Sequence, residues 1–376
     1  MNIFITKSKS IYTKDFMLKG ERYPQNVHSI ESFFDGTDSG YKYICENIYS
    51  ELFPEEEIVS FNELANKEGK NAVIIASGTS EWAGSGTHLP HVKPEYTLKT
   101  PFFTLINILS GKVVNKLGWH DYLTTDATAC ISGYKAFLEA ELIMKEGLAD
   151  RVLVIGVDDQ INSLVLELFG MLEASISPEL EAKGVKPSAF DDINYGFRLG
   201  HGAGYILLEN DHSLKESGNT PIATLNNTSL TAEKLGNPFG QSSDGSGYEK
   251  IIRQVLEKSK VDKNDISFIK THGTGSKSNN SAEKNGIKKV FGENFIATSY
   301  KPEIGHTLGA NAIVELDIAL KDAQNGFVRG IKNRTKYDEQ FLSYDKDMDV
   351  SKILFLGSGM GNVYAASIAT LYNEDT

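Results

Sequence analysis

The chain has 376 residues, 40% hydrophobic and 23% charged, with a formal net charge of −12 at pH 7. This length is enough for two average domains with a sizeable core, and the acidic balance argues against a nucleic-acid-binding surface, which needs a basic patch. Two cysteines, Cys45 and Cys130, exclude a disulfide framework and a cysteine-rich metal cluster. With no signal-like N-terminus and no apolar run of 18 residues, the sequence predicts a cytoplasmic protein that does not enter a membrane.

The first half of the chain alternates short apolar runs with segments of helical period. The runs predict strands at 2–6, 71–76, 122–125, 151–157 and 202–209. Helical spacing predicts helices at 41–52, 102–117, after Cys130 and at 163–172. Segments 7–40 and 79–100 are predicted as loops, as is the acidic run 55–57. Such alternation is typical of an α/β fold with a parallel or mixed sheet covered by helices.

The second half repeats this rhythm. Strands are predicted at 222–230, 267–271, 295–299, 352–356 and 363–370, with helices at 248–259, 282–291 and 308–323. Polar, Gly/Ser/Asn-rich segments at 210–219 and 231–246 separate the two series. We therefore expect two similar βα lobes, residues 1–220 and 221–376, packed as one structural unit.

The stretch TDATACISGYKAFLEAELIMKEG (125–147) places Cys130 between a strand and a helix. Small residues flank the cysteine, so another segment or a ligand can approach its sulfur. A cysteine in the first turn of a helix is close to unpaired N–H groups, which predicts a stabilised thiolate. The helix is expected to bury one stripe, formed by Tyr134, Phe137, Leu138, Leu142 and Ile143. A small buried residue before a helix is the competing interpretation.

Two histidine segments follow predicted strands in the second half, THGTGS (271–276) and KPEIGHTLGA (301–310). Glycine touches the histidine in both, so a substrate can approach the imidazole. With Cys130, His272 and His306 could form a Cys–His nucleophilic site whose second imidazole polarises a carbonyl. The same three residues could ligate zinc, but they lack the paired spacing that usually forms such sites. The glycine-rich segment 196–204 precedes a strand, which makes it a poor nucleotide loop, and no bound cofactor is predicted.

Five ordered motifs together resemble the elongating β-ketoacyl-acyl carrier protein synthases, the Cys-His-His branch of the thiolase-fold condensing enzymes. ATACISG resembles their nucleophile motif, and AFDDINYGFRLGHGAGYILLE resembles the block that follows. THGTGSKSNNSAE and SYKPEIGHTLGA resemble the two histidine motifs, and GSGMGN (357–362) the C-terminal turn. The resemblance runs from about residue 71 to the C-terminus.

The resemblance implies a five-layered α/β/α/β/α sandwich and a decarboxylative Claisen condensation. Cys130 would carry the acyl group, and His272 and His306 would stabilise the enolate of a malonyl thioester. Lys301 would support the charge balance and pair with Glu283. The substrates would be phosphopantetheine thioesters on an acyl carrier protein. The family is usually dimeric, so a homodimer or a ketosynthase/chain-length-factor heterodimer is expected.

The resemblance also implies an oxyanion hole, formed by the backbone amides of Cys130 and Met360, and an acyl gate at Ile131 and Met360. Four positions depart from the family pattern: Ile131 replaces a small polar residue, His201 and Asn280 replace acidic residues, and Met360 replaces a phenylalanine. These departures favour a specialised pathway, such as polyketide or polyene assembly. Two alternatives are a non-catalytic chain-length-factor-like partner and a Cys–His acyltransferase or hydrolase.

Overall fold

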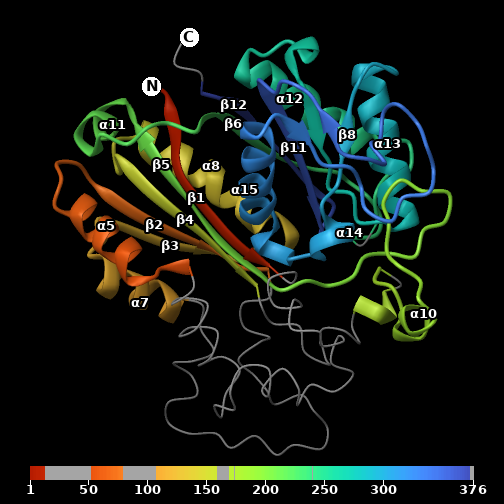
Figure 1. Ribbon diagram of the computed structural model, residues 1–376, viewed down its shortest axis with the longest axis horizontal. Helices are drawn as coiled ribbons and strands as arrows, with labels where there is room; N and C mark the ends of the chain where they lie inside the picture. The colour runs from red at the N-terminus through yellow and green to blue at the C-terminus, as the bar shows by residue number, and fades with distance from the viewer. Residues whose placement is uncertain (13–51, 79–106, 159–168, 173, 239, 373–376) are drawn as a thin grey trace, which may run out of the picture.

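A ten-stranded mixed sheet is the centre of the protein (Figure 1). The computed structural model describes residues 1–12, 52–78, 107–158, 169–172, 174–238 and 240–372. The strand order is β3-β2-β4-β5-β1-β6-β12-β11-β7-β8, so the first five strands of the chain form one half of the sheet.

The N-terminal half contains β1 (Ile3–Tyr12), β2 (Asn71–Ala76), β3 (Tyr122–Asp126), β4 (Arg151–Asp158) and β5 (Gly202–Asn210). β2 is parallel to β3 and β4, whereas β5 is antiparallel to β4 and β1. All six residues of β2 and all eight of β4 are buried, as expected for strands covered on both faces.

The C-terminal half contains β6 (Ala223–Ala232), β7 (Phe268–Lys270), β8 (Ala297–Thr298), β11 (Lys352–Gly359) and β12 (Val363–Leu371). Its order, β8-β7-β11-β12-β6, repeats the order of the first half, with the same parallel and antiparallel senses. The halves meet where β1 pairs with β6 through Phe4↔Thr224 and Ile5↔Ala223. β9 (Phe327–Val328) and β10 (Lys346–Asp347) form a separate small sheet.

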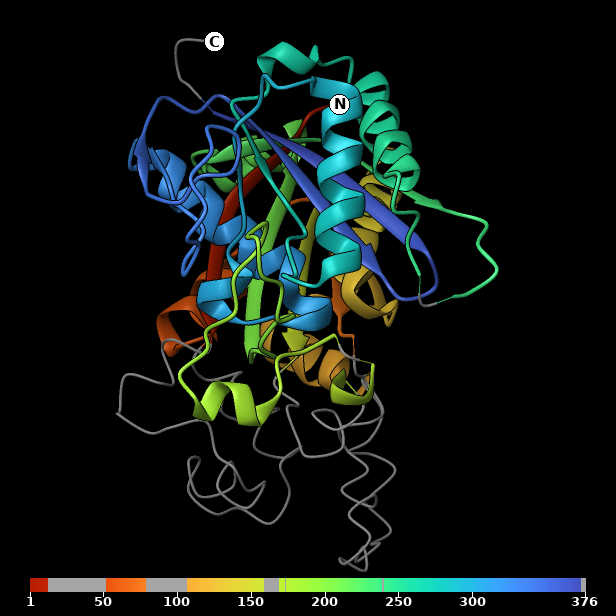
Figure 2. The same cartoon turned by 90° about the vertical axis from the view of Figure 1, so that its right-hand side faces the viewer.

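Six longer helices within the described residues complete the layers. α5 (Glu55–Ala65) and α7 (Asn107–Leu117) cover the outer face of the N-terminal half, and α8 (Ser132–Lys145) and α15 (Asn311–Gln324) lie between the halves. α12 (Ser246–Ser259) and α13 (Lys277–Phe291) cover the outer face of the C-terminal half, where Figure 2 shows them side by side. One hydrophobic cluster fills the two inner interlayer spaces around α8 and α15, and a separate cluster fills each outer one. The predicted five-layered fold class is confirmed.

The two inner helices approach each other closely at a glycine. A Cβ added to Gly133 on α8 would lie 2.5 Å from Cδ1 of Ile313 and 2.8 Å from Cβ of Ala312, both on α15. Gly133 therefore permits the close approach of another segment that was predicted next to Cys130. That segment is the helix of the opposite half.

Most predicted elements are present, although many of them begin or end at other residues than predicted. The acidic run 55–57 is not a loop but the first turn of α5, whose Phe61 and Leu64 are buried. Segment 210–219 contains α11 (Asp211–Ser217), capped by Asn210. Leu142 is 53% exposed, so it does not belong to the buried stripe of α8.

Residues 7–12 of the predicted loop 7–40 belong to β1 instead, because this segment pairs with β5. The rest of that loop, the predicted helices 41–52 and 163–172, and the loop 79–100 lie wholly or largely outside the described residues. α10 (Pro178–Ala182), α14 (Lys301–Ile304) and the 3₁₀ turns η2 (Ala129–Ile131), η3 (Lys263–Asp265) and η4 (Leu308–Ala310) were not predicted as separate elements. Among the described helices, none has the length and apolar character needed to cross a bilayer. The division at residue 220 stays a prediction.

Candidate active site

Cys130 is the middle residue of η2, in the connection between β3 and α8. Ala129 adopts a positive φ of 50°, a conformation that L-residues rarely take, so the backbone turns sharply before the cysteine. Ser132 fixes this turn, because its hydroxyl accepts from Thr128 N at 2.9 Å and donates to Ala129 O at 2.6 Å. The predicted strand–cysteine–helix arrangement is present.

The sulfur of Cys130 lies in an apolar environment. The residue is 6% exposed and clusters with Phe169, Phe197, Leu199 and Leu308. Burial raises the pKa of the Cys130 thiol to about 12, although the Lys301 ammonium acts in the opposite direction. The predicted stabilised thiolate is therefore wrong for the ligand-free protein, because desolvation outweighs the favourable electrostatics.

His272 follows β7 and is 4% exposed. Its backbone N–H donates to Oε1 of Glu283 at 2.6 Å, and Gly273 N donates to Oε2 at 2.8 Å. Glu283 on α13 therefore holds the loop that carries the imidazole. Burial raises the pKa of Glu283 to about 7, while these two amides lower it. Within the described residues, Nδ1 of His272 has no hydrogen-bond partner.

His306 faces His272, with ring centroids 5.4 Å apart and planes at 82°. Leu308 N donates to Nδ1 of His306 at 3.2 Å, so the proton of the neutral ring is on Nε2. Burial lowers the pKa of both imidazoles well below the ordinary value, and the Lys301 charge lowers it further. The site thus holds two neutral imidazoles, and the orientation of His306 makes its Nε2–H a hydrogen-bond donor.

Lys301 begins α14 and is 1% exposed. Its Nζ donates to Oε1 of Glu315 at 2.7 Å. Among the described residues, no hydrogen bond or ion pair joins Lys301 to Glu283. The predicted Lys301–Glu283 pair is wrong because Glu283 is occupied by backbone amides. Glu315, on α15, also accepts from Lys270.

Asp158, at the end of β4, links the two halves of the site. Its Oδ2 accepts from Gly78 N at 2.7 Å and from Gly309 N at 2.6 Å, and its Oδ1 from Ser77 Oγ at 3.0 Å. Because Gly309 lies three residues after His306, this carboxylate fixes the second histidine segment against the N-terminal half. Sequence reasoning missed Asp158, although a polar residue directly after a buried strand is a usable signal.

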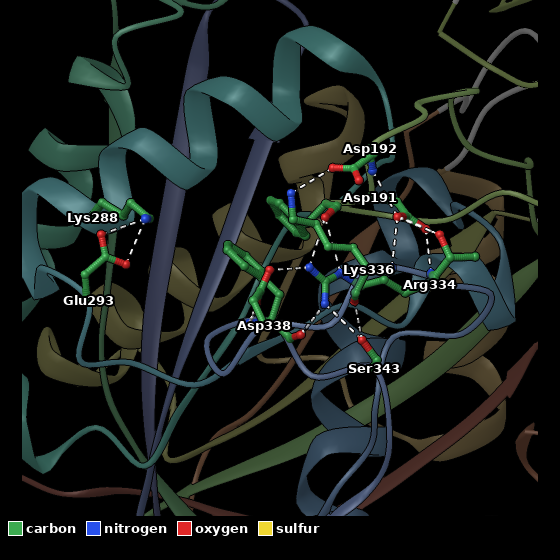
Figure 3. Close-up of polar contacts among 11 residues, drawn as sticks. Asp191, Asp192, Lys288, Glu293, Arg334, Lys336, Asp338 and Ser343 are labelled. Atoms are coloured by element: carbon green, nitrogen blue, oxygen red, sulfur yellow. Dashed lines mark hydrogen bonds and ion pairs between the residues drawn. The ribbon is translucent and has the colours of Figure 1, made fainter.

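A polar network fixes the loop that precedes Phe197 (Figure 3). The buried guanidinium of Arg334 donates to Phe190 O at 3.2 Å and to Phe341 O at 2.6 Å. Asp191 accepts from Thr335 N at 2.7 Å. This loop continues to Phe197, whose ring packs edge-on against His306 at a centroid distance of 4.9 Å. The network therefore supports one wall of the site.

The remaining predicted residues occupy different environments. Ile131 is 4% exposed and belongs to the inner core, whereas Met360 is 41% exposed in the turn after β11. Asn280 is buried and donates to Asn194. His201 is half-buried just before β5. Among the described residues, no group of three or more His, Cys, Asp or Glu side chains is placed to hold a metal ion.

Family models match both halves of the chain. The model for the beta-ketoacyl synthase N-terminal domain matches residues 57–213, and that for the beta-ketoacyl synthase C-terminal domain matches residues 222–333. These ranges contain Cys130, His272 and His306. The chain belongs to the beta-ketoacyl synthase family.

Curated relatives include polyketide ketoacyl synthases and a 3-oxoacyl-[acyl-carrier-protein] synthase. The tetracenomycin polyketide synthase ketoacyl synthase alpha subunit of Streptomyces glaucescens is 26% identical over 78% of this chain and 69% of that relative. The mitochondrial 3-oxoacyl-[acyl-carrier-protein] synthase of Arabidopsis thaliana is 26% identical over 70% of this chain and 59% of that relative. Relatives from Streptomyces virginiae and Streptomyces coelicolor are 28% and 26% identical; the matches cover 67% and 70% of this chain but only 61% and 57% of those relatives' lengths.

Solved structures agree on the fold. A type II PKS structure of an acyl-carrier protein in complex with its ketosynthase superposes with a TM-score of 0.79 at 18% identity, covering 99% of both chains. A beta-ketoacyl synthase from Burkholderia phymatum superposes with a TM-score of 0.77 at 17% identity, covering 99% of this chain and 100% of that one.

Proposed function

We propose that the protein is a β-ketoacyl synthase, an acyltransferase that condenses a malonyl thioester with an acyl group held on Cys130. The observation that carries this proposal is the pair of neutral imidazoles beside the cysteine turn. The hydrogen bond from Leu308 N to His306 Nδ1 leaves Nε2–H free to donate. Two such donors suit an oxygen on which negative charge develops.

The first step transfers an acyl group from a phosphopantetheine thioester to the sulfur of Cys130. The C–S bond to the carrier breaks, a C–S bond to Cys130 forms, and the thiol proton leaves with the released carrier thiol. Because the pKa of the resting thiol is about 12, the proton must leave as the sulfur attacks. The nearby Lys301 charge favours this transfer.

The amides of Cys130 and Met360 would form the oxyanion hole for this transfer. The end of β11 is close enough to support that role, since a Cβ added to Gly359 would lie 3.7 Å from Cys130 N. It would also lie 3.5 Å from Cγ2 of Ile131, the other gate residue. The exposed Met360 side chain would then border the acyl group.

The second step is decarboxylation of the malonyl thioester. Its C–C bond breaks, CO₂ leaves, and the electron pair forms an enolate whose oxygen accepts from His272 and His306. The enolate carbon then attacks the Cys130 thioester, and the sulfur leaves as a thiolate that regains a proton. Neutral imidazoles are needed, because a proton on Nδ1 of His306 would face the Leu308 N–H donor.

An acyl carrier protein is the proposed partner, and the enzyme would act in the cytoplasm as a homodimer or with a chain-length-factor subunit. One structural neighbour is the ishigamide ketosynthase/chain length factor, which keeps the second arrangement open for this chain. Cys130, His272 and His306 together favour the catalytic role over the non-catalytic one. A hydrolase would need only one base, so the second imidazole favours condensation.

Intact-protein mass spectrometry tests the nucleophile. After incubation with acyl-phosphopantetheine thioesters, the wild type should gain the mass of one acyl group, and the Cys130→Ala variant none. A Cys45→Ala variant is the matched control, because it removes the other cysteine and should load normally. Absence of an adduct with every donor, alone and with a carrier protein, would contradict the proposal.

The condensation step is tested with His306→Ala. This variant should still load an acyl group on Cys130 but release less CO₂ from malonyl-carrier protein, by about 10²-fold or more. Unchanged condensation would contradict the assigned role of His306. Release of free acid instead of a condensed product by the wild type would indicate a hydrolase.

A further inference from the structure

Lys270 is a second buried lysine at the site, and the mechanism above does not use it. It is the last residue of β7, two positions before His272, and its side chain has no exposed surface. A buried ammonium is costly unless it is paired and hydrogen-bonded, so its position requires an explanation.

Glu315 pairs with both lysines. Its Oε1 accepts from Nζ of Lys301 at 2.7 Å, and its Oε2 accepts from Nζ of Lys270. Lys270 also donates to Leu356 O at 3.3 Å. Two ammonium groups thus share one carboxylate, and all three side chains are at most 1% exposed. The triad carries one positive charge in excess.

This excess charge lies among the groups that carry out the proposed reaction. The Lys270 charge lowers the pKa of His272, His306 and Glu283. The other ionisable groups around the cluster are Tyr134 from α8, Asp158 from β4, Cys130 from η2 and Lys301 from α14. Glu283 accepts hydrogen bonds from the backbone amides of His272 and Gly273, so the ionisation of Glu283 also affects the position of the His272 imidazole.

We propose that Lys270 is a positioning residue for the condensation: by sharing Glu315 with Lys301, it keeps one excess positive charge at the site and adds to burial in keeping both rings neutral. The charge acts on three groups. It disfavours protonation of both imidazoles and favours the ionised form of Glu283, whose carboxylate holds the His272 loop. The catalytic meaning of this inference rests on the proposed condensation, but the charge effect itself does not.

Titration of ¹³C-labelled histidine by NMR tests the proposal without any substrate. The chain has eight histidines, and His272→Gln and His306→Gln variants assign the two signals. In Lys270→Met, protonation of both rings should begin about one pH unit higher than in the wild type, because a like charge has been removed. Lys270→Gln removes the same charge but keeps a donor for Glu315, and it replaces the Met variant if that variant does not fold.

Arg151→Met is the matched control. Arg151 is another fully buried cation, paired with Glu209 at 3.4 Å on the N-terminal half. Its removal should lower stability without moving the titration of His272 or His306. Lys270→Arg, which keeps the charge, should restore the wild-type titration. Unchanged titration in both neutral Lys270 variants, or an equal shift in Arg151→Met, would overturn the proposal.

Activity supplies a separate readout. The acidic limb of the condensation rate should move about one pH unit higher in Lys270→Gln, whereas a structural role would lower the rate equally at every pH. If the histidine titration shifts but the wild type catalyses no condensation, the proposed function is wrong and the charge effect is still supported. If the wild type condenses and the pH profile of the rate is unchanged in the variant, the role of Lys270 is wrong and the proposed function is still supported.

Discussion

The two halves of the protein use the same turn for different purposes. In each half, a 3₁₀ turn leads into an inner helix, η2 into α8 and η4 into α15. Each turn begins with a residue of positive φ, Ala129 at 50° and Leu308 at 44°. The middle residue is Cys130 in the first half and Gly309 in the second. The first turn places a sulfur in a cluster of apolar side chains, whereas the second donates a backbone N–H to Asp158.

This difference indicates how a duplicated architecture builds one asymmetric site. A 3₁₀ turn that begins with a residue of positive φ is present in both halves, and only the side chains of the turn differ. Gly309 packs directly against the backbone of Ser77 and Gly78, just after β2, and this contact requires a residue without a side chain. The following predictions test that division between the halves.

Substitution at Gly309 should have the largest effect on stability. In Gly309→Ala, the added Cβ would lie 2.2 Å from Gly78 N and 2.5 Å from the carbonyl carbon of Ser77. Backbone atoms cannot move aside cheaply, so we expect a loss of about 3 kcal/mol in the free energy of unfolding, measured with urea. Gly111→Ala on α7, where nothing in the described part of the chain lies within 4 Å, is the control and should be neutral or stabilising. Equal stability of the two variants would refute the close packing of Gly309 against Ser77 and Gly78.

The first residues of the two inner helices should contribute differently to stability and to acylation of Cys130. Asn311 donates from Nδ2 to Cys130 O at 2.8 Å and so joins the turns. Asn311→Ala removes that buried hydrogen bond, at a cost of about 2 kcal/mol, and should slow acylation of Cys130 about tenfold. Ser132→Ala, at the equivalent position of α8, removes a hydroxyl that bonds within its own turn and to Ser77 O at 3.1 Å, and should cost about 1 kcal/mol. Urea unfolding and mass-detected acyl loading measure both effects, and a larger loss in Ser132→Ala would reverse the ranking.

The two inner helices also carry buried glutamates whose lysine partners lie at different distances. Glu315 on α15 is hydrogen-bonded by two lysines, whereas Glu141 on α8 has Lys145 at 3.8 Å and Lys258 at 4.0 Å, beyond hydrogen-bond distance. Burial raises the pKa of Glu141 from 4.5 to about 7. The folded state therefore retains a proton that the unfolded state releases, and stability should fall as pH rises from 4.5 to 7.

Glu141→Gln removes that dependence. We expect the variant to be about 2 kcal/mol more stable than the wild type at pH 8, with the difference closing towards pH 4.5. Urea unfolding across this pH range measures it. Glu146→Gln, at an exposed position just after α8, should leave the wild-type pH dependence in place. Parallel curves for the wild type and Glu141→Gln would contradict the assignment.

Local sequence signals predicted the strands more accurately than they predicted which side chains pair in the folded protein. The bounds of β2 were predicted at both ends because its apolar run is short and bordered by turn residues. α11 was missed although its capping box, Asn210 with Ser213, is a readable signal. The Glu315 pairing was missed because a glutamate in the apolar run NAIVEL gives no sign of its partners. Lys270 and Lys301 reach it from segments about 30 residues apart, and only the fold brings them together.

The same limit applies to the state of the cysteine. Its position before a helix was predicted, but the pKa of its thiol depends on burial by Phe169, Phe197, Leu199 and Leu308, which come from three other segments. Charge and burial at one atom are properties of the assembled chain.

The central position of β1 has a consequence for how the chain is made. β1 starts at Ile3, but its partners β5 and β6 start at Gly202 and Ala223 (Figure 1). At a translation speed of 5–20 residues per second, the apolar Ile3, Phe4 and Ile5 wait roughly 10 to 40 s before their partner strands exist. The strand that joins the two halves is thus made about 200 residues before the strands with which it pairs. During that interval its unpaired backbone N–H and C=O groups are open to pairing with another nascent chain.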